Sequence, residues 1–145
     1  MSREVEQQNR RMLRARDAMD RQYADPLDIP ALARIAHVSE AHFIRTFRST
    51  FGETPHRDLQ RRRVERAMAM LISTERSVTD ICMSVGFSSL DTFSRTFRDI
   101  VGESPKDYRA AHPTVGRVPT HFSMAWTRPS DLSSSFGEER GPGPA

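Results

Sequence analysis

The residues best suited to chemistry in this sequence are arginines that recur in one frame. The segment Phe43-Ile-Arg-Thr-Phe-Arg returns fifty residues later as Phe93-Ser-Arg-Thr-Phe-Arg. These copies contain Arg45, Arg48, Arg95 and Arg98. A guanidinium is a planar fork that donates paired hydrogen bonds to a guanine edge or to a phosphate. The arginines therefore indicate a nucleic-acid-binding surface. For Arg45 and Arg95, a solvated face or a salt bridge to a neighbouring carboxylate is the alternative.

The similarity between the two segments extends beyond these arginines. Eight of the thirteen positions from Phe43 to Pro55 are identical to those from Phe93 to Pro105. A solenoid needs three or more stacked units, and this segment occurs only twice. The pattern therefore predicts one domain made of two similar halves, each built around the same helix.

Composition permits a polyanionic partner. The net charge is +3 with a pI near 9.7, and all but one of the 22 basic residues are arginine. This arginine bias is explained equally by codon usage and by phosphate or guanine recognition. The single cysteine, Cys82, excludes an internal disulfide and fits a reducing compartment. Without a membrane span or a secretory leader, the chain is expected to be soluble and cytoplasmic.

The elements that position these arginines are predicted to be helices throughout. The expected fold class is all-α, with about seven helices in two helix-turn-helix subdomains joined by a long linker helix. The first helix is expected within Val5 to Tyr23, although the polar residues 1–11 are expected to lack fixed structure. The two helix-turn-helix pairs are expected at 28–36 with 39–51, and at 77–85 with 88–101, each with an N-terminal capping side chain. A short seventh helix is expected from Pro105 to Ala111.

The linker helix is predicted from Pro55 to Ser73. Its apolar positions are Leu59, Val64, Ala67, Met68 and Leu71, and its exposed side is expected to carry Arg57, Arg61, Arg62, Arg63 and Arg66. About 19 residues correspond to roughly 28 Å of helix, close to the roughly 34 Å between successive major grooves on one face of DNA. One chain could thus present two recognition helices to adjacent groove segments without dimerising.

The outward faces of helices 39–51 and 89–101 form the predicted DNA-binding site. The predicted DNA-binding residues are Ser39, Glu40, Ala41, His42, Ile44, Arg45, Arg48, Ser89, Leu90, Asp91, Thr92, Ser94, Arg95 and Arg98. Arg57, Arg61 and Arg62 are expected to contact phosphates. Between 34 and 66 there are eight arginines and four acids, but between 76 and 109 five basic residues meet five acids. The first half and the linker should therefore supply most phosphate contacts.

These predictions divide the chain into five segments. They are 1–24 (polar segment and first helix), 25–54 (first helix-turn-helix), 55–74 (linker helix), 75–112 (second helix-turn-helix) and 113–145 (tail). The tail is rich in Pro, Gly and Ser, and is expected to be largely disordered. Within it Phe122, Met124 and Trp126 alternate with polar residues, which favours an extended segment laid against the domain over a partner-binding motif.

The motifs from about Asp25 to Arg109 resemble the DNA-binding domain of the AraC/XylS family of transcription regulators. The resemblance is carried by the repeated Phe-x-Arg-x-Phe-Arg-x3-Gly-x-Thr/Ser-Pro motif, by Arg63-Val-Glu-Arg-Ala67, and by Gly86-Phe87. It implies seven helices, with helices three and six in the major groove of double-stranded DNA. It also implies a regulator that recruits or obstructs RNA polymerase. Cys82 replaces the family's usual alanine, which argues against a redox sensor.

Other functions have weaker support. No catalytic pair and no cofactor-binding motif occurs at useful spacing, so neither an enzyme nor a cofactor is expected. His37, His42 and His56 lack the short spacing of metal ligands. Too few residues precede Asp25 for an effector-binding domain, and a monomer on DNA is expected. The alternatives are a non-specific architectural DNA binder, which needs basic charge in both halves, and a protein-interaction module.

Overall fold

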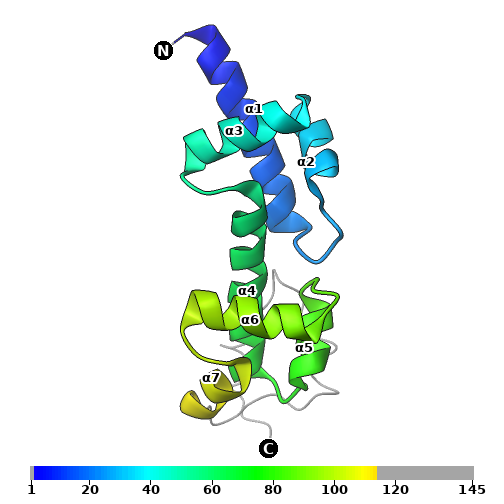
Figure 1. The fold of residues 1–145 in the computed structure, drawn as a ribbon, viewed down its shortest axis with the longest axis vertical. Coiled ribbons are helices and arrows are strands. Elements are labelled where there is room, and N and C mark those ends of the chain that lie inside the picture. The colour runs from blue at the N-terminus through cyan, green and yellow to red at the C-terminus, as the bar shows by residue number, and fades with distance from the viewer. Residues whose placement is uncertain (1, 114–145) are drawn as a thin grey trace, which may run out of the picture. The chain divides into compact units, whose positions relative to one another are not determined.

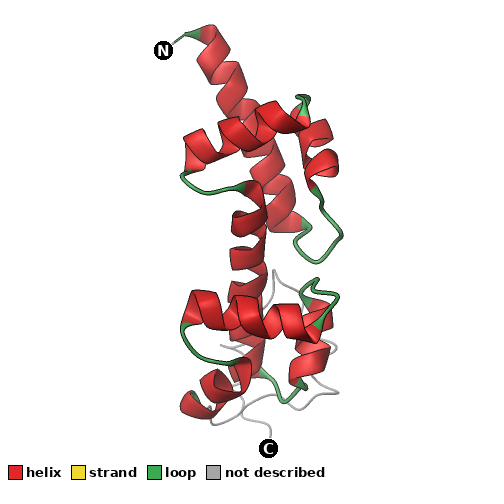
Figure 2. Cartoon of the chain, in the orientation of Figure 1, coloured by secondary structure: helices red, strands yellow, loops and turns green. Residues whose placement is uncertain are grey.

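The computed structural model describes residues 2–113, and this part of the chain contains seven α-helices and no β-strand (Figures 1 and 2). The helices are α1 (Arg3–Arg21), α2 (Ile29–Ala36), α3 (Glu40–Phe51), α4 (Pro55–Ser73), α5 (Val78–Ser84), α6 (Leu90–Val101) and α7 (Pro105–Ala111). The predicted all-α class with seven helices is confirmed. The predictions for the tail, including Phe122, Met124 and Trp126, concern residues outside the described range.

The chain forms two compact units, and the boundary between them falls inside a helix. The first unit is Met1–Arg63 and the second is Val64–Ala145. Because α4 runs from Pro55 to Ser73, its first half belongs with α1 to α3 and its second half with α5 to α7. No loop joins the two units.

In the first unit, α2 and α3 pack against α1 (Figure 1). The inward side of α1 is formed by the buried side chains Met12, Ala15, Ala18 and Met19. Phe43 and Phe47 of α3 are fully buried against them, as is Leu32 of α2 at 1 % exposure. Aromatic and aliphatic burial of this kind contributes about 1.5–3 kcal/mol per large side chain, so it is the main source of the unit's stability.

The first helix begins earlier than the sequence predicted. Residues 1–11 were expected to lack fixed structure, yet α1 starts at Arg3 and its first turns project beyond α2 and α3 (Figure 1). The Ser2 side chain accepts a hydrogen bond from the Val5 amide, and Glu4 and Glu6 lie in the first turn. A capping serine and early acids stabilise a helix N-terminus without any burial. The polar composition was therefore mistaken for an absence of structure.

The second unit repeats the construction of the first, including its long helix. In the half of α4 that belongs to this unit, the buried apolar residues are Val64, Ala67, Met70 and Leu71. Their spacing is the same as that of the four buried residues of α1, so the second half of α4 is the counterpart of α1. The sequence repeat covers only the helix-turn-helix segments and does not predict this equivalence. Met70 is the buried methionine of α4, whereas Met68, predicted on its apolar side, is half-buried.

Each recognition-type helix begins and ends in the same way. The hydroxyls of Ser39 and Ser89 accept hydrogen bonds from the amides three residues later, at His42 and Thr92. Ser89, not Ser88, is thus the cap of α6. Both helices end at a glycine with positive φ, 84° at Gly52 and 98° at Gly102, a conformation that costs glycine little.

The turns inside the two helix pairs differ. His37 ends α2 with φ 59°, and Val38 donates its amide to the Ala33 carbonyl five residues earlier. In the second pair Gly86 has φ 105°, and Phe87 donates to the Cys82 carbonyl in the same pattern. From this turn to the capping serine there is one more residue in the second pair than in the first. Because the two turn hydrogen bonds correspond, Cys82 is the counterpart of Ala33 in the first half.

Candidate nucleic-acid interface

The candidate interface in the first unit is the outer face of α3. Phe43 and Phe47 point inward, with ring centroids 5.6 Å apart. Phe51 continues this row at 4.7 Å from Phe47 but is only half-buried, so the fully buried part of the row ends at Phe47. The outer face of α3 exposes the side chains of Glu40, Ala41, Ile44, Arg45 and Arg48.

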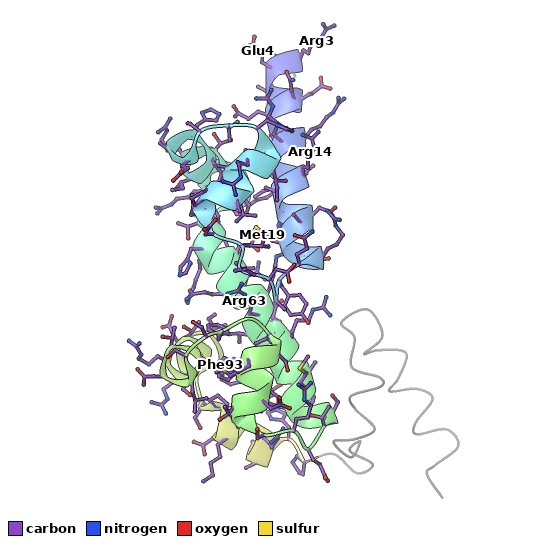
Figure 3. The ribbon with its side chains drawn as sticks, turned by 90° about the vertical axis from the view of Figure 1, so that its right-hand side faces the viewer. Arg3, Glu4, Arg14, Met19, Arg63 and Phe93 are labelled. Carbon is purple, nitrogen blue, oxygen red and sulfur yellow. The ribbon has the colours of Figure 1, made fainter. Side chains whose placement is uncertain are left out.

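The corresponding face in the second unit belongs to α6. Phe93 and Phe97 are fully buried, and their ring centroids are 5.8 Å apart; Figure 3 labels Phe93 on this helix. Phe87 packs on Phe93 at 5.2 Å, and Tyr108 of α7 packs on Phe97 at 5.7 Å. The outer face of α6 exposes Leu90, Asp91, Thr92, Arg95 and Arg98, with Ser94 half-buried beside them.

The remaining predicted residues of the interface have local structural roles. The Ser39 and Ser89 hydroxyls already accept hydrogen bonds from their helix N-termini. His42 is half-buried, and its Nε2 lies 3.4 Å from the Thr46 hydroxyl. The predicted residues of each half are thus brought together on one helix face, with Ser39 and Ser89 at its N-terminal edge.

The arginines of the two faces differ in their surroundings. Within residues 2–113, Arg45, Arg48 and Arg98 make no ion pair or side-chain hydrogen bond. Arg95 places its Nη2 3.5 Å from Oδ2 of Asp91, one turn earlier on α6, and both side chains are largely exposed. In α3 the position of Asp91 is occupied by Ala41, so Arg45 has no such neighbour.

The arginines of α4 are not the exposed row that the sequence analysis expected. Arg57, Arg61, Arg62, Arg63 and Arg66 are all half-buried. Arg61 donates to Glu53 at 2.8 Å, and Arg62 donates to Asp58 at 2.5 Å and to Asp20 at 2.9 Å. Arg61 is thus held by the loop before α4 and Arg62 by α1, and the helical periodicity of α4 alone does not reveal these contacts.

A buried carboxylate organises this cluster. Asp58 is fully buried, and its oxygens lie within 4 Å of Arg16 on α1 and of Arg61 and Arg62 on α4. The Arg16 guanidinium also stacks over the Phe51 ring at 4.3 Å. The sequence analysis did not single out Asp58. Its spacing of three and four residues before Arg61 and Arg62 was the available signal.

Arg63, labelled in Figure 3, ties α4 to the end of α1. Its guanidinium donates to the backbone carbonyls of Tyr23 at 2.6 Å and Asp25 at 2.8 Å. Burial lowers the pKa of this guanidinium, but an arginine remains charged in proteins. In the second unit Arg109 donates to the Leu71 and Thr74 carbonyls. Each unit thus uses an arginine to satisfy backbone carbonyls: Arg63 binds those of the segment just after α1, and Arg109 binds those at the end of α4.

Within residues 2–113, no group of three or more His, Cys, Asp or Glu side chains is placed to hold a metal ion. In the same range, none of the helices is both long and apolar enough to span a membrane.

Comparison with known proteins identifies this arrangement of helices. A family described as a helix-turn-helix domain matches residues 32–111. The regulatory protein SoxS of Salmonella typhimurium is 35 % identical over 91 residues, which cover 63 % of this chain and 85 % of SoxS. The DNA-binding domain of AdpA, solved in complex with a target DNA, superposes with a TM-score of 0.64 at 32 % identity, covering 69 % of this chain and 90 % of that one.

Another relative is much longer than this chain. An uncharacterised helix-turn-helix transcriptional regulator of Staphylococcus aureus is 31 % identical over 99 residues, which cover 68 % of this chain. The match spans only 13 % of that regulator's length. The family consists of transcriptional regulators rather than enzymes. The chain belongs to the AraC-type helix-turn-helix family of transcriptional regulators, and residues 32–111 form its DNA-binding domain.

Proposed function

We propose that this protein is a sequence-specific transcription regulator that inserts α3 and α6 into successive major-groove segments of double-stranded DNA. The observation that carries this proposal is the pair of matching helix faces. Each helix buries two phenylalanines inward and exposes two arginines outward, namely Arg45 with Arg48 and Arg95 with Arg98. Burial fixes the rotation of each helix, so the arginines are held on the outer face.

The surrounding side chains suit contact with base edges. Ile44 is 38 % exposed and Leu90 is 40 % exposed, although large aliphatic residues usually lie inside. In a major groove such side chains contact the thymine methyl group. Because the apolar, acidic and small side chains differ between the two faces, each helix is proposed to read a different sequence. One chain is proposed to suffice as a monomer, with RNA polymerase as a further partner at the promoter.

Phosphate contacts are proposed mainly for the first unit and α4. Arg48 and Arg98 are exposed on the recognition helices, and Arg57 lies at the N-terminal end of α4. Arg61 and Arg62 can contribute only if phosphate replaces their present carboxylate partners, Glu53, Asp58 and Asp20. Their contribution is therefore expected to be smaller than that of Arg48, which is exposed on α3.

Selection of binding sites from random DNA tests the main proposal. The expected result is an asymmetric motif spanning about two helical turns, bound by one chain per duplex. A short palindrome bound by two chains, or the absence of any motif, would contradict it. If no motif is selected and the affinity for DNA falls steeply with salt concentration, the protein is instead a non-specific architectural binder.

Single substitutions locate the two helices on the selected site. Arg45→Ala and Arg95→Ala should each weaken binding by about 1–3 kcal/mol and relax the preference at different base pairs. Arg14→Ala is the matched control, because Arg14 is an exposed arginine of α1 and its loss changes the net charge equally. Equal weakening on every sequence would mark Arg45 or Arg95 as phosphate contacts.

A further inference from the structure

We infer that Asp91 is the specificity-determining residue of α6, because it makes DNA contact by Arg95 conditional on a G·C base pair. This inference rests on the proposed function of α6 as a recognition helix. Its starting observation is the ion pair between Arg95 and Asp91, 3.5 Å apart on the outer face of α6. No equivalent exists on α3, where Ala41 stands in place of Asp91.

The ion pair has little value for folding. The side chains of Arg95 and Asp91 are 73 % and 85 % exposed. Solvent-exposed pairs one helical turn apart contribute little to stability, because water and salt screen both charges. Asp91 is therefore expected to act mainly on DNA binding, because solvent is displaced in the complex and charge interactions are then stronger.

In free protein, Asp91 competes with phosphate for Arg95. A phosphate that approaches Arg95 also approaches the Asp91 carboxylate, and like charges repel. On α3, Arg45 is exposed without a carboxylate one turn away, since the residue four positions earlier is Ala41. Arg45 is thus free to contact phosphate on any sequence, whereas Arg95 is not.

A matching base pair removes the conflict. Guanine offers O6 and N7 to an arginine, and cytosine offers its N4 amino group to a carboxylate. A G·C pair therefore satisfies both Arg95 and Asp91. Thymine places its O4 acceptor in the same region, which would leave the desolvated carboxylate without a donor and would cost affinity. The acid thus penalises wrong sequences more than it stabilises the right one.

The test compares three duplexes: the selected site, the same site with the G·C pair opposite α6 changed to A·T, and an unrelated sequence. Asp91→Asn keeps the side-chain shape and removes the charge. It should raise affinity for the unrelated and substituted duplexes by about tenfold and change affinity for the selected site less than about threefold. The affinity for unrelated DNA should also depend more steeply on salt concentration, by the slope expected of about one additional phosphate contact, because Arg95 becomes available.

Two further proteins separate this role from a general charge effect. In Arg95→Ala, the additional change Asp91→Asn should alter the base preference less than it does in the wild-type protein, because the part of the effect that acts through Arg95 is then absent. Ala41→Asp transfers the pair to α3 and should lower affinity for unrelated DNA by about tenfold. An equal rise in affinity on all three duplexes with Asp91→Asn would overturn the inference. Absence of any selected motif with the wild-type protein would instead overturn the proposed function.

Discussion

At the scale of single residues, the clearest feature is the buried thiol of Cys82. The equivalent helical position in the first half is Ala33. Cys82 is fully buried, with its Sγ 3.7 Å from the Ser89 carbonyl oxygen. Burial raises the pKa of this thiol, because a thiolate loses its hydration inside the protein. Cys82 therefore acts as a small apolar side chain that packs α5 against the start of α6.

We predict that Cys82 resists thiol reagents at neutral pH in the folded protein and reacts rapidly in urea. A disulfide-exchange reagent followed by absorbance measures both rates. The raised folded-state pKa also fixes the pH effect: the contribution of the thiol to stability is complete below its unfolded pKa of about 8.5 and is lost as pH rises above that value. Cys82→Ala, which copies Ala33, should abolish this alkaline loss. Fast labelling without denaturant would contradict the burial.

His37 supplies a second prediction, because it adopts a left-handed conformation at φ 59°. An L-residue pays a steric cost there that glycine does not. His37→Gly should therefore stabilise the protein by about 0.5–1 kcal/mol in urea unfolding. The converse change at the matching turn, Gly86→Ala at φ 105°, should destabilise it by about 1–2 kcal/mol. Destabilisation by His37→Gly would show that the imidazole has a compensating contact.

At the scale of elements, helix caps were readily predicted and burial was not. The cap at Ser39 and the helix ends at Phe51 and Val101 depend on backbone geometry within a few residues, and each one lies where the sequence placed it. The half-burial of the α4 arginines and the choice of Met70 over Met68 depend on which neighbouring helix covers α4. A single helical pattern contains no information about that neighbour, and the polar start of α1 lacked the apolar pattern used to recognise helices.

The N-terminal turns of α1 allow a direct test of this correction. Removal of residues 2–10 should reduce the helical circular dichroism signal, since α1 begins at Arg3. It should change the free energy of unfolding by less than about 1 kcal/mol, because burial in α1 starts at Met12. Met12→Ala is the contrasting variant and should cost about 2–5 kcal/mol. An unchanged helical signal after truncation would mean that these turns are not formed in solution.

At the scale of the whole molecule, polar contacts as well as apolar ones join segments that are distant in sequence. Asp58 joins Arg16 to Arg61 and Arg62, and Arg62 reaches on to Asp20. A buried carboxylate is tolerated only when paired, so this cluster holds α1 against the start of α4. Such networks depend on the assembled fold, and the sequence analysis foresaw the arginines without their partners.

We expect Asp58→Ala to destabilise the protein by about 3 kcal/mol, because it leaves Arg16 and Arg62 without their shared carboxylate. Partial exposure of Arg16 lowers this figure from the larger cost of a fully buried charge. The measurement is urea unfolding followed by the helical signal in far-ultraviolet circular dichroism. Glu53→Ala is the control, since Glu53 is partly exposed and its partner Arg61 keeps Asp58 as a second carboxylate, and it should cost less than about 1 kcal/mol. Similar costs for both changes would show that burial of Asp58 is unimportant.

Because the two units share α4, the domain cannot be divided between them at a loop. The first unit ends at Arg63 and the second begins at Val64, so the peptide bond between them lies in mid-helix. Proteases cleave extended, accessible chain and not intact helix. Limited digestion is therefore not expected to release two separate half-domains, and a gene fragment cut at this point would start or stop inside a helix. Two similar halves have become inseparable because the last helix of one is also the first helix of the other.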